Sequence, residues 1–188
     1  MTSIRFQDAL GQHVLILGDV GAGKTKLTMT LLDEAIAMGA TKQITVIDMA
    51  PTERYVGSMK VGGQLREFSP HLDVVRYLAP SHVETPRLSA TSSQELHRLV
   101  ALNKCRITPL LQTFLHTPSP ILFINDVSLY LQSGSLSLVA QILHAAETCI
   151  VNGYYGQALQ TKLDDPISRI ERHLMDQLIE DMDIILKL

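Results

Sequence analysis

A segment near the amino end combines glycines, a lysine and a threonine at a spacing that can hold phosphate. Its eight residues fit the pattern G-x-x-x-x-G-K-[ST]. Glycines let backbone N–H groups close around phosphate oxygens without a Cβ in the way, and a helix that begins at the lysine adds the positive end of its dipole. The pattern therefore predicts a nucleotide-phosphate site made of Gly18, Asp19, Val20, Gly21, Ala22, Gly23, Lys24, Thr25 and Lys26.

Two side chains of this segment have specific chemistry. Lys24 is expected to reach the β- and γ-phosphate oxygens as a mobile charge, and the Thr25 hydroxyl is expected to ligate Mg²⁺. An ordinary glycine-rich turn is the alternative interpretation. The apolar run before the segment and the helical pattern after it favour the phosphate site.

A second apolar run, Ile121–Ile124, is followed by Asn125 and Asp126. A buried strand that ends in aspartate is the Walker B pattern, in which the carboxylate supports Mg²⁺ beside the phosphates. On its own the pattern is weak, because aspartate also often ends a strand before a turn. With the upstream loop present, we expect Asp126 to act on the metal side together with Thr25.

The elements that must position these residues alternate along the chain. Short apolar runs, continuous rather than alternating with polar residues, predict strands buried on both faces of a parallel sheet. These runs are His13–Leu17, Ile44–Ile47, Val74–Leu78, Ile121–Ile124, Cys149–Val151 and Ile184–Leu188.

Helical patterns lie between the runs. An apolar stripe from Leu27 to Met38 is followed by Gly39, a typical helix end. Ser92 and Glu95 form a capping box for a long helix, which we expect Pro109 to break or restart. Further helices are predicted from Leu136 to Ala146 and from Asp165-Pro166 to Leu178, while residues 80–91 read as a loop.

This alternation predicts the α/β class, with a three-layer α/β/α sandwich, a mostly parallel sheet and right-handed crossovers. We find no repeat or linker, and expect one P-loop NTPase domain over residues 1–188.

With both motifs in hand, the sequence resembles the P-loop NTPases and, within them, the RecA-like ATPases, the group that includes KaiC. The resemblance covers most of the chain. It implies a further strand between the two motif strands, and Ile44–Ile47 and Val74–Leu78 both occur between Thr25 and Asp126 along the chain. It also implies that the protein binds ATP with Mg²⁺ and hydrolyses the β–γ phosphate bond.

The catalytic base departs from the family pattern. RecA-like enzymes commonly have a glutamate just after the second strand, where this chain has Ala50, and other ATPases have one directly after the Walker B aspartate, where Val127 stands. Glu53 is the first candidate, because Pro51 enforces a turn that could carry it over the γ-phosphate. Asp48 is the second candidate, with strand capping as its alternative role.

Other polar residues are weaker candidates. A residue past the strand at Cys149–Val151 could sense the terminal phosphate, although each eligible residue is more easily explained as a loop polar group: Asn152, Gln157 and Gln160. Tyr154 and Tyr155 could stack on a base, with packing against the sheet as the alternative. Loop cations are expected to be solvated and are assigned no role: Arg54, Lys60, Arg66, Arg76 and Arg87.

Composition limits the remaining possibilities. Of 188 residues, 46% are hydrophobic and 19% charged, which excludes a disordered chain, and a net charge of −3 does not indicate nucleic-acid binding through bulk positive charge. Cys105 and Cys149 show neither a disulfide framework nor zinc spacing. We find no signal peptide or membrane-spanning run and expect a cytoplasmic protein with no membrane partner.

These features predict an enzyme or switch that binds a nucleoside triphosphate. The leading hypothesis is an ATPase that turns over slowly or with a partner. The alternatives are a nucleotide-gated regulatory or assembly subunit without turnover, and a phosphotransferase of the kinase and GTPase branch. ATP is favoured over GTP because no N-K-x-D pattern occurs, and a second copy of the chain or a protein partner is expected.

Overall fold

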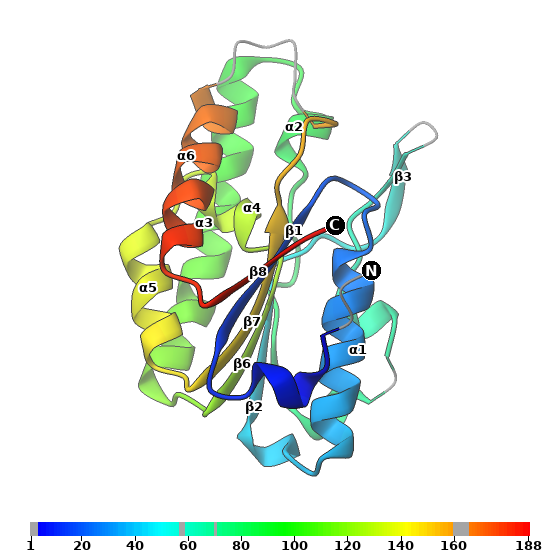
Figure 1. The fold of residues 1–188 in the computed structure, drawn as a ribbon. Coiled ribbons are helices and arrows are strands. Elements are labelled where there is room, and N and C mark those ends of the chain that lie inside the picture. Colours follow the sequence, from blue (N-terminus) through cyan, green and yellow to red (C-terminus); the bar gives the residue numbers. More distant parts are fainter. Residues whose placement is uncertain (1–3, 57–58, 70, 160–165) are drawn as a thin grey trace.

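A six-stranded sheet organises the computed structural model, which describes residues 4–56, 59–69, 71–159 and 166–188. The strand order is β5-β2-β6-β7-β1-β8, and each neighbouring pair is parallel (Figure 1). The strands are β1 His13–Gly18, β2 Ile44–Asp48, β5 Arg76–Leu78, β6 Ile121–Asn125, β7 Thr148–Tyr154 and β8 Ile184–Lys187. Each overlaps one of the six predicted runs.

Helices cover both faces of this sheet. They are α1 Lys24–Ala37, α2 Pro86–Ser89, α3 Ser93–His116, α4 Val127–Leu131, α5 Leu136–His144 and α6 Pro166–Glu180. Single 3₁₀ turns occur at Phe6–Ala9, Thr41–Gln43, Leu65–Glu67 and Leu72–Val74. The last of these takes up the start of the predicted Val74–Leu78 run, which is why β5 is shorter than expected.

The two faces have separate apolar cores. Helix α1 lies on one face, where Leu31 and Leu32 pack with Val46 and Phe123 of the sheet. Helices α3 to α6 lie on the other face, on the opposite side of the sheet in Figure 1. The α/β/α arrangement of layers is therefore as predicted.

The strand order places β7 between β1, which leads into the glycine-rich loop, and β6, which ends before Asp126. A strand between the two motif strands distinguishes the RecA-like branch from the kinase and GTPase branch, in which they are adjacent. Its identity differs from the expectation: β2 and β5 lie beyond β6, and the inserted strand follows β6 along the chain. The connection from β1 to β2 therefore passes over β7 and β6, and the connection from β5 to β6 passes over β2.

Helix α3 corrects a second prediction. Pro109 lies inside one continuous helix of 24 residues and neither breaks nor restarts it. A proline costs the helix one backbone donor, but Ile107 before it and Leu111 and Phe114 after it are buried in the same core. Packing on both sides of the proline keeps the helix continuous. The predicted cap is present, since Ser92 Oγ accepts a hydrogen bond from the Glu95 N–H.

Two small elements were not expected. Strands β3 Arg54–Val56 and β4 Met59–Val61 form an antiparallel hairpin after β2, and the loop at residues 80–91 contains the single-turn helix α2. Short elements such as these offer too few residues for a periodic pattern.

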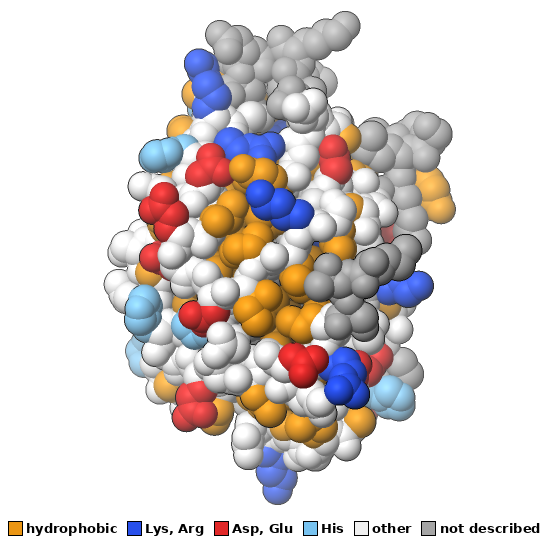
Figure 2. Space-filling model, viewed as in Figure 1, with side chains coloured by type: hydrophobic (Ala, Val, Ile, Leu, Met, Phe, Trp, Pro, Cys, Tyr) orange, Lys and Arg blue, Asp and Glu red, His pale blue; other side chains and the backbone are white. Residues whose placement is uncertain are grey.

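One face of the molecule shows a band of hydrophobic side chains, in the region where β8 and α6 lie in Figure 1 (Figure 2). Strand β8 is the edge of the sheet beside β1, and Ile170 and Leu188 are among the exposed large hydrophobic side chains. No helix in the described ranges is both long and apolar enough to cross a bilayer.

Candidate functional site: a glycine-rich loop facing a polar wall

The loop between β1 and α1 has the backbone that its glycines predict. Gly21 and Gly23 adopt φ values of 75° and 94°, a region that residues with a Cβ rarely occupy. Gly23 is the N-cap of α1 and offers no side chain to the helix end. The first-turn N–H groups therefore remain available to an anion at the helix N-terminus.

Lys24 lies within this loop. Its ammonium donates hydrogen bonds to the carbonyl oxygens of Gly18 and Asp19, at 3.0 and 2.7 Å. Burial lowers the pKa of Lys24, and the carboxylates of Asp126 and Asp19 oppose that shift. The ammonium is thus electrostatically coupled to the acidic residue at the end of β6, and both residues line the same cavity.

Asp19 joins the loop to the segment after β7. Its carboxylate accepts hydrogen bonds from the N–H groups of Val20, Gln157 and Ala158, at 2.7 to 3.2 Å. Although partial burial alone would raise it, the pKa of Asp19 is lowered by these donors and by Lys24. Gly156 has to lack a side chain here, because a Cβ would lie 2.3 Å from the Asp19 carboxyl carbon.

Asp126 faces the loop from the end of β6. It has φ 61° and ψ 57°, and is the one non-glycine residue with positive φ in the described ranges. Its carboxylate accepts from Ser128 Oγ at 2.6 Å, and its N–H donates to Asn152 Oδ1 at 2.9 Å. Burial raises its pKa, opposed by the hydrogen bond from Ser128 and by the charges of Lys24 and Arg87.

A chain of buried polar side chains runs behind Asp126 across three strands. The Asn152 amide donates to Thr28 Oγ1 of α1 and to Asn125 Oδ1, both at 2.8 Å. The Asn125 amide then donates to Asp48 Oδ1 at 2.9 Å. All four side chains are almost fully buried, so the network fixes the ends of β2, β6 and β7 relative to α1.

The same contacts show what Asp48 does. It accepts hydrogen bonds from the N–H groups of Ala50 and Leu65, the Tyr77 hydroxyl and the Asn125 amide. Burial raises the pKa of Asp48 against the effect of these donors. Asp48 therefore caps the end of β2, which is the alternative role considered for it in the sequence analysis.

A cavity of about 320 Å³ opens between the loop and the end of the sheet. Its lining brings together most of the predicted site residues: Val20, Gly21, Gly23, Lys24, Thr25, Lys26, Glu53 and Asp126. Gly18, Asp19 and Ala22 form the loop behind that lining. Glu53 and Asp126 are the acidic residues that line the cavity within the described part of the chain, and the Glu53 N–H donates to the Glu67 carboxylate at 3.0 Å.

The oxygen donors in the cavity suit Mg²⁺. A carboxylate and a hydroxyl, from Asp126 and Thr25, are hard ligands of the kind that this ion takes beside phosphate oxygens and water. The described residues contain no group of three or more His, Cys, Asp or Glu that could hold a metal by themselves. A magnesium site here would therefore take its remaining ligands from a nucleotide or from water.

The wall opposite the loop includes a cation to which the sequence assigned no role. Arg87 of α2 and Gln132, just after α4, line the cavity. The Arg87 guanidinium forms an ion pair of 2.7 Å with Glu171 of α6, and these side chains are only 6% and 4% exposed. Gln132 donates to the same carboxylate at 2.9 Å. Arg87 is thus buried and paired, and its predicted solvation is wrong.

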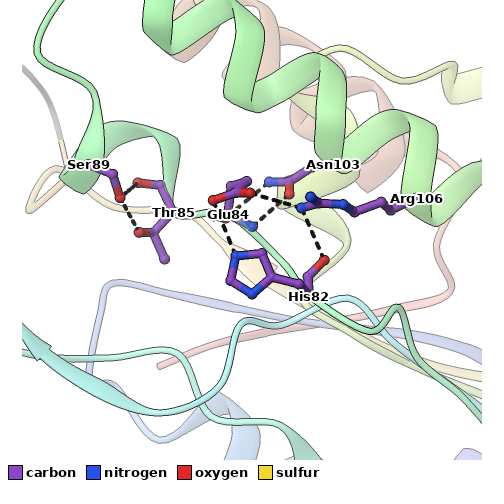
Figure 3. Close-up of polar contacts among 6 residues, drawn as sticks. All are labelled: His82, Glu84, Thr85, Ser89, Asn103 and Arg106. Carbon is purple, nitrogen blue, oxygen red and sulfur yellow. Dashed lines mark hydrogen bonds and ion pairs between the residues drawn. The ribbon is translucent and has the colours of Figure 1, made fainter.

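Polar contacts fix the loop that carries Arg87 to helix α3 (Figure 3). The Glu84 N–H donates to Asn103 Oδ1 at 2.8 Å, and the Asn103 amide donates back to the Glu84 carbonyl at 3.1 Å. The Glu84 carboxylate pairs with Arg106 at 2.9 Å and with His82 at 3.3 Å. Thr85 and Ser89, whose hydroxyls lie 2.8 Å apart, close the single turn of α2. These contacts hold the backbone on both sides of Arg87 and tie the preceding loop to α3.

The weaker candidates differ in whether their side chains line the cavity. Asn152 lines the cavity, but its amide is used within the buried network, and the exposed Gln157 meets Asp19 through its backbone. Tyr154 lines the cavity, with Arg87 over its ring, whereas Tyr155 packs against Arg172 of α6. Gln160 and the side chains of Arg54 and Lys60 lie outside the described part of the structure.

Two comparisons by sequence found nothing: no family model matches the chain, and no curated protein matches it. Solved structures do match over nearly the whole chain. A DNA replication initiation factor is 17% identical with a TM-score of 0.40, covering 97% of this chain and 43% of its own. An ATPase from the type III secretion system of pathogenic bacteria is 16% identical with a TM-score of 0.42, covering 95% and 51%.

The flagellar accessory protein FlaH from Methanocaldococcus jannaschii is 10% identical with a TM-score of 0.41, covering 95% of this chain and 71% of its own. The chain spans about half the length of the first two structures. The topology itself is more informative than these distant similarities. With a glycine-rich loop after β1, β7 between the motif strands and helices on both faces, the chain has the fold of the RecA-like P-loop NTPases.

Proposed function

We propose that this protein binds ATP with Mg²⁺ in the cavity between the glycine-rich loop and Asp126, and hydrolyses the β–γ phosphate bond slowly or with a partner. The observation that carries the proposal is that five residues of the glycine-rich loop line the same cavity as Asp126, namely Val20, Gly21, Gly23, Lys24 and Thr25. ATP is preferred over GTP because no N-K-x-D pattern is present.

The loop would bind the phosphates through its N–H groups and the dipole of α1. The Lys24 ammonium would leave the carbonyls of Gly18 and Asp19 for the β- and γ-phosphate oxygens. Thr25 and Asp126 would hold Mg²⁺, which when bound neutralises charge on those phosphates. Because the Asp126 N–H is fixed by Asn152, its carboxylate is held in place before the nucleotide arrives.

Glu53 is the candidate that would orient the attacking water and accept its proton. It lines the cavity, whereas Asp48 is committed to four hydrogen bonds and is absent from the lining. General bases contribute roughly a hundredfold or more to rate, so Glu53→Gln should slow turnover by about that factor while leaving ATP affinity within about twofold.

A nucleotide-gated subunit without turnover is the second candidate, and a specific observation favours it. The two positions where related ATPases place a glutamate are Ala50 and Val127, and both side chains are buried. Steady phosphate release from purified protein, lost in Asp126→Ala, would exclude this candidate. ATP binding without phosphate release would support it over the ATPase.

We expect the protein to work in the cytoplasm, with a second copy of itself or another protein as partner. Hydrophobic side chains form a band on the face where β8 lies (Figure 2), and Leu188, just after β8, is 51% exposed. Mass measurement of the purified protein with and without ATP would show whether a second copy binds.

A further inference from the structure

The Arg87 side chain has hydrogen-bonding capacity that its ion pair does not use. Its Nε lies buried without a hydrogen-bond partner among the described residues, although the guanidinium is paired through Nη2 with Glu171. The Gln132 Oε1 atom is buried and unpartnered in the same way, while its amide nitrogen donates to Glu171. Buried polar groups are nearly always satisfied, and both atoms belong to residues that line the cavity, so one donor and one acceptor remain for a ligand or a bound water.

The two atoms are complementary to a phosphate with its water. An Arg N–H is a strong donor to phosphate oxygens, and an amide oxygen accepts from a water bound beside them. Both residues line the cavity that holds Lys24 and Asp126. The charges of Lys24 and of Arg87 both act on the pKa of Asp126, so the expected metal-side residue is electrostatically coupled to both cations.

We propose that Arg87 binds the terminal phosphate of the nucleotide and exchanges Glu171 for it, so that the contact between α2 and α6 depends on whether a triphosphate or a diphosphate is bound. This inference rests on the proposed function. Lys24 and the loop would bind the phosphates of either nucleotide, whereas Arg87 would contact only the terminal phosphate of the triphosphate, from the facing wall.

The surroundings of the pair permit this exchange. Glu171 keeps the hydrogen bond from Gln132 when the arginine leaves. Burial raises the pKa of Glu171 to about 7, opposed by Arg87 and Gln132 and reinforced by Asp126, so the carboxylate can take up a proton instead of remaining a lone buried charge. The Tyr154 ring centroid lies 5.5 Å from the guanidinium and is a further favourable contact of the cation beside Glu171.

The test is a titration of each protein with fluorescent ATPγS and ADP analogues at constant Mg²⁺, which gives the ratio of the two affinities. Arg87→Lys keeps the charge but loses the planar fork. The double variant Arg87→Met/Glu171→Gln removes both charges, and the introduced amide can satisfy both ends of the Gln132 amide, so the variant should fold. Both should lose about tenfold to a hundredfold in ATPγS affinity with ADP affinity within about twofold.

Glu171→Gln alone is the matched control, since it frees the arginine without removing it. It should keep or raise the affinity for ATPγS relative to ADP. An unchanged ratio in both Arg87 variants, or equal losses for the two nucleotides, would show that Arg87 is only structural. If the wild type binds neither nucleotide, the proposed function itself fails; if it binds both and the ratio never changes, only this inference fails.

Discussion

The two walls of the cavity are built in different ways. The loop wall consists of eight consecutive residues that act through backbone N–H groups, and its shape depends on two glycines with positive φ. The facing wall gathers side chains from α2, the end of β6, β7 and the region after α4, with a buried network and an ion pair behind them. From this difference we expect substitutions in the loop to weaken ligand binding more than stability, and substitutions in the buried network behind the facing wall to weaken stability more than binding.

The largest effect is expected behind the facing wall. Asp48→Ala removes the acceptor of four hydrogen bonds and leaves the half-buried Tyr77 hydroxyl and the buried Asn125 amide without it, which should cost about 3 kcal/mol of unfolding free energy. Glu53→Ala, a cavity-lining carboxylate five residues later, should stay within about 0.5 kcal/mol. Urea denaturation of both variants measures this. Equal losses would remove the distinction between the two carboxylates.

The buried carboxylate of Glu171 should make stability depend on pH, because burial raises its pKa against the effect of Arg87. Glu171 has a folded-state pKa of about 7, above the ordinary value of 4.5, so the folded state holds its proton longer than the unfolded chain. Stability from this group is therefore full below about pH 4.5 and falls as pH rises to about 7. Arg87, Asp126 and Tyr154 are the charged or titratable groups coupled to it.

The measurement is the unfolding free energy of wild type and of Glu171→Gln at pH 5 and pH 8. Wild type should lose about 2 kcal/mol more than the variant over this range, since other titrating groups cancel in the difference. Parallel pH profiles would mean that the pair stays ionised throughout.

Asn152 joins the two walls, because it bonds both Asp126 and Thr28 of α1. Asn152→Ala should cost about 2 kcal/mol of unfolding free energy and should also weaken the Mg²⁺ dependence of nucleotide binding, as Asp126 loses its support. The exposed Gln157 offers a matched control, and Gln157→Ala should stay near wild type in both measurements. A stable Asn152→Ala protein would argue against the network as the link between the walls.

The smallest stability effect should come from the loop wall itself. Gly23→Ala and Gly39→Ala both place a Cβ on a residue with positive φ, 94° and 82°, and neither Cβ meets another atom within 4 Å. Each should cost about 1 kcal/mol. Only Gly23→Ala should also lower ATP affinity, because Gly39 lies at the far end of α1; a similar affinity loss in both would contradict a local role for the loop.

The same difference between the walls explains what could be predicted. The loop wall and the strands are local: the glycine pattern and the continuous apolar runs report them directly. Which strand lies between β1 and β6 depends on crossovers that no local pattern encodes. Pro109 follows the same logic, since packing by Leu111 and Phe114 overrode the local tendency to break the helix.

The facing wall was largely missed because its members are far apart in the chain. One signal was present: Glu171 lies four residues after Ile167 and four before Met175, on the buried stripe of α6. A carboxylate on such a stripe must be paired, but its partner Arg87 lies 84 residues earlier, in a loop that seemed solvated. The hydrogen bonds of Asn125 and Asn152 likewise become visible only once β6 and β7 are adjacent.

The central claim is that the loop at residues 18–25 binds the phosphates of ATP. The most direct test titrates wild type and Lys24→Ala with a fluorescent ATP analogue, with GTP and ATP as competitors, in the presence and absence of Mg²⁺. We expect tighter binding with Mg²⁺, stronger competition by ATP, and at least a hundredfold loss of affinity in the variant, about 2.7 kcal/mol. Equal affinity of the two proteins, or no binding by wild type, would contradict the account.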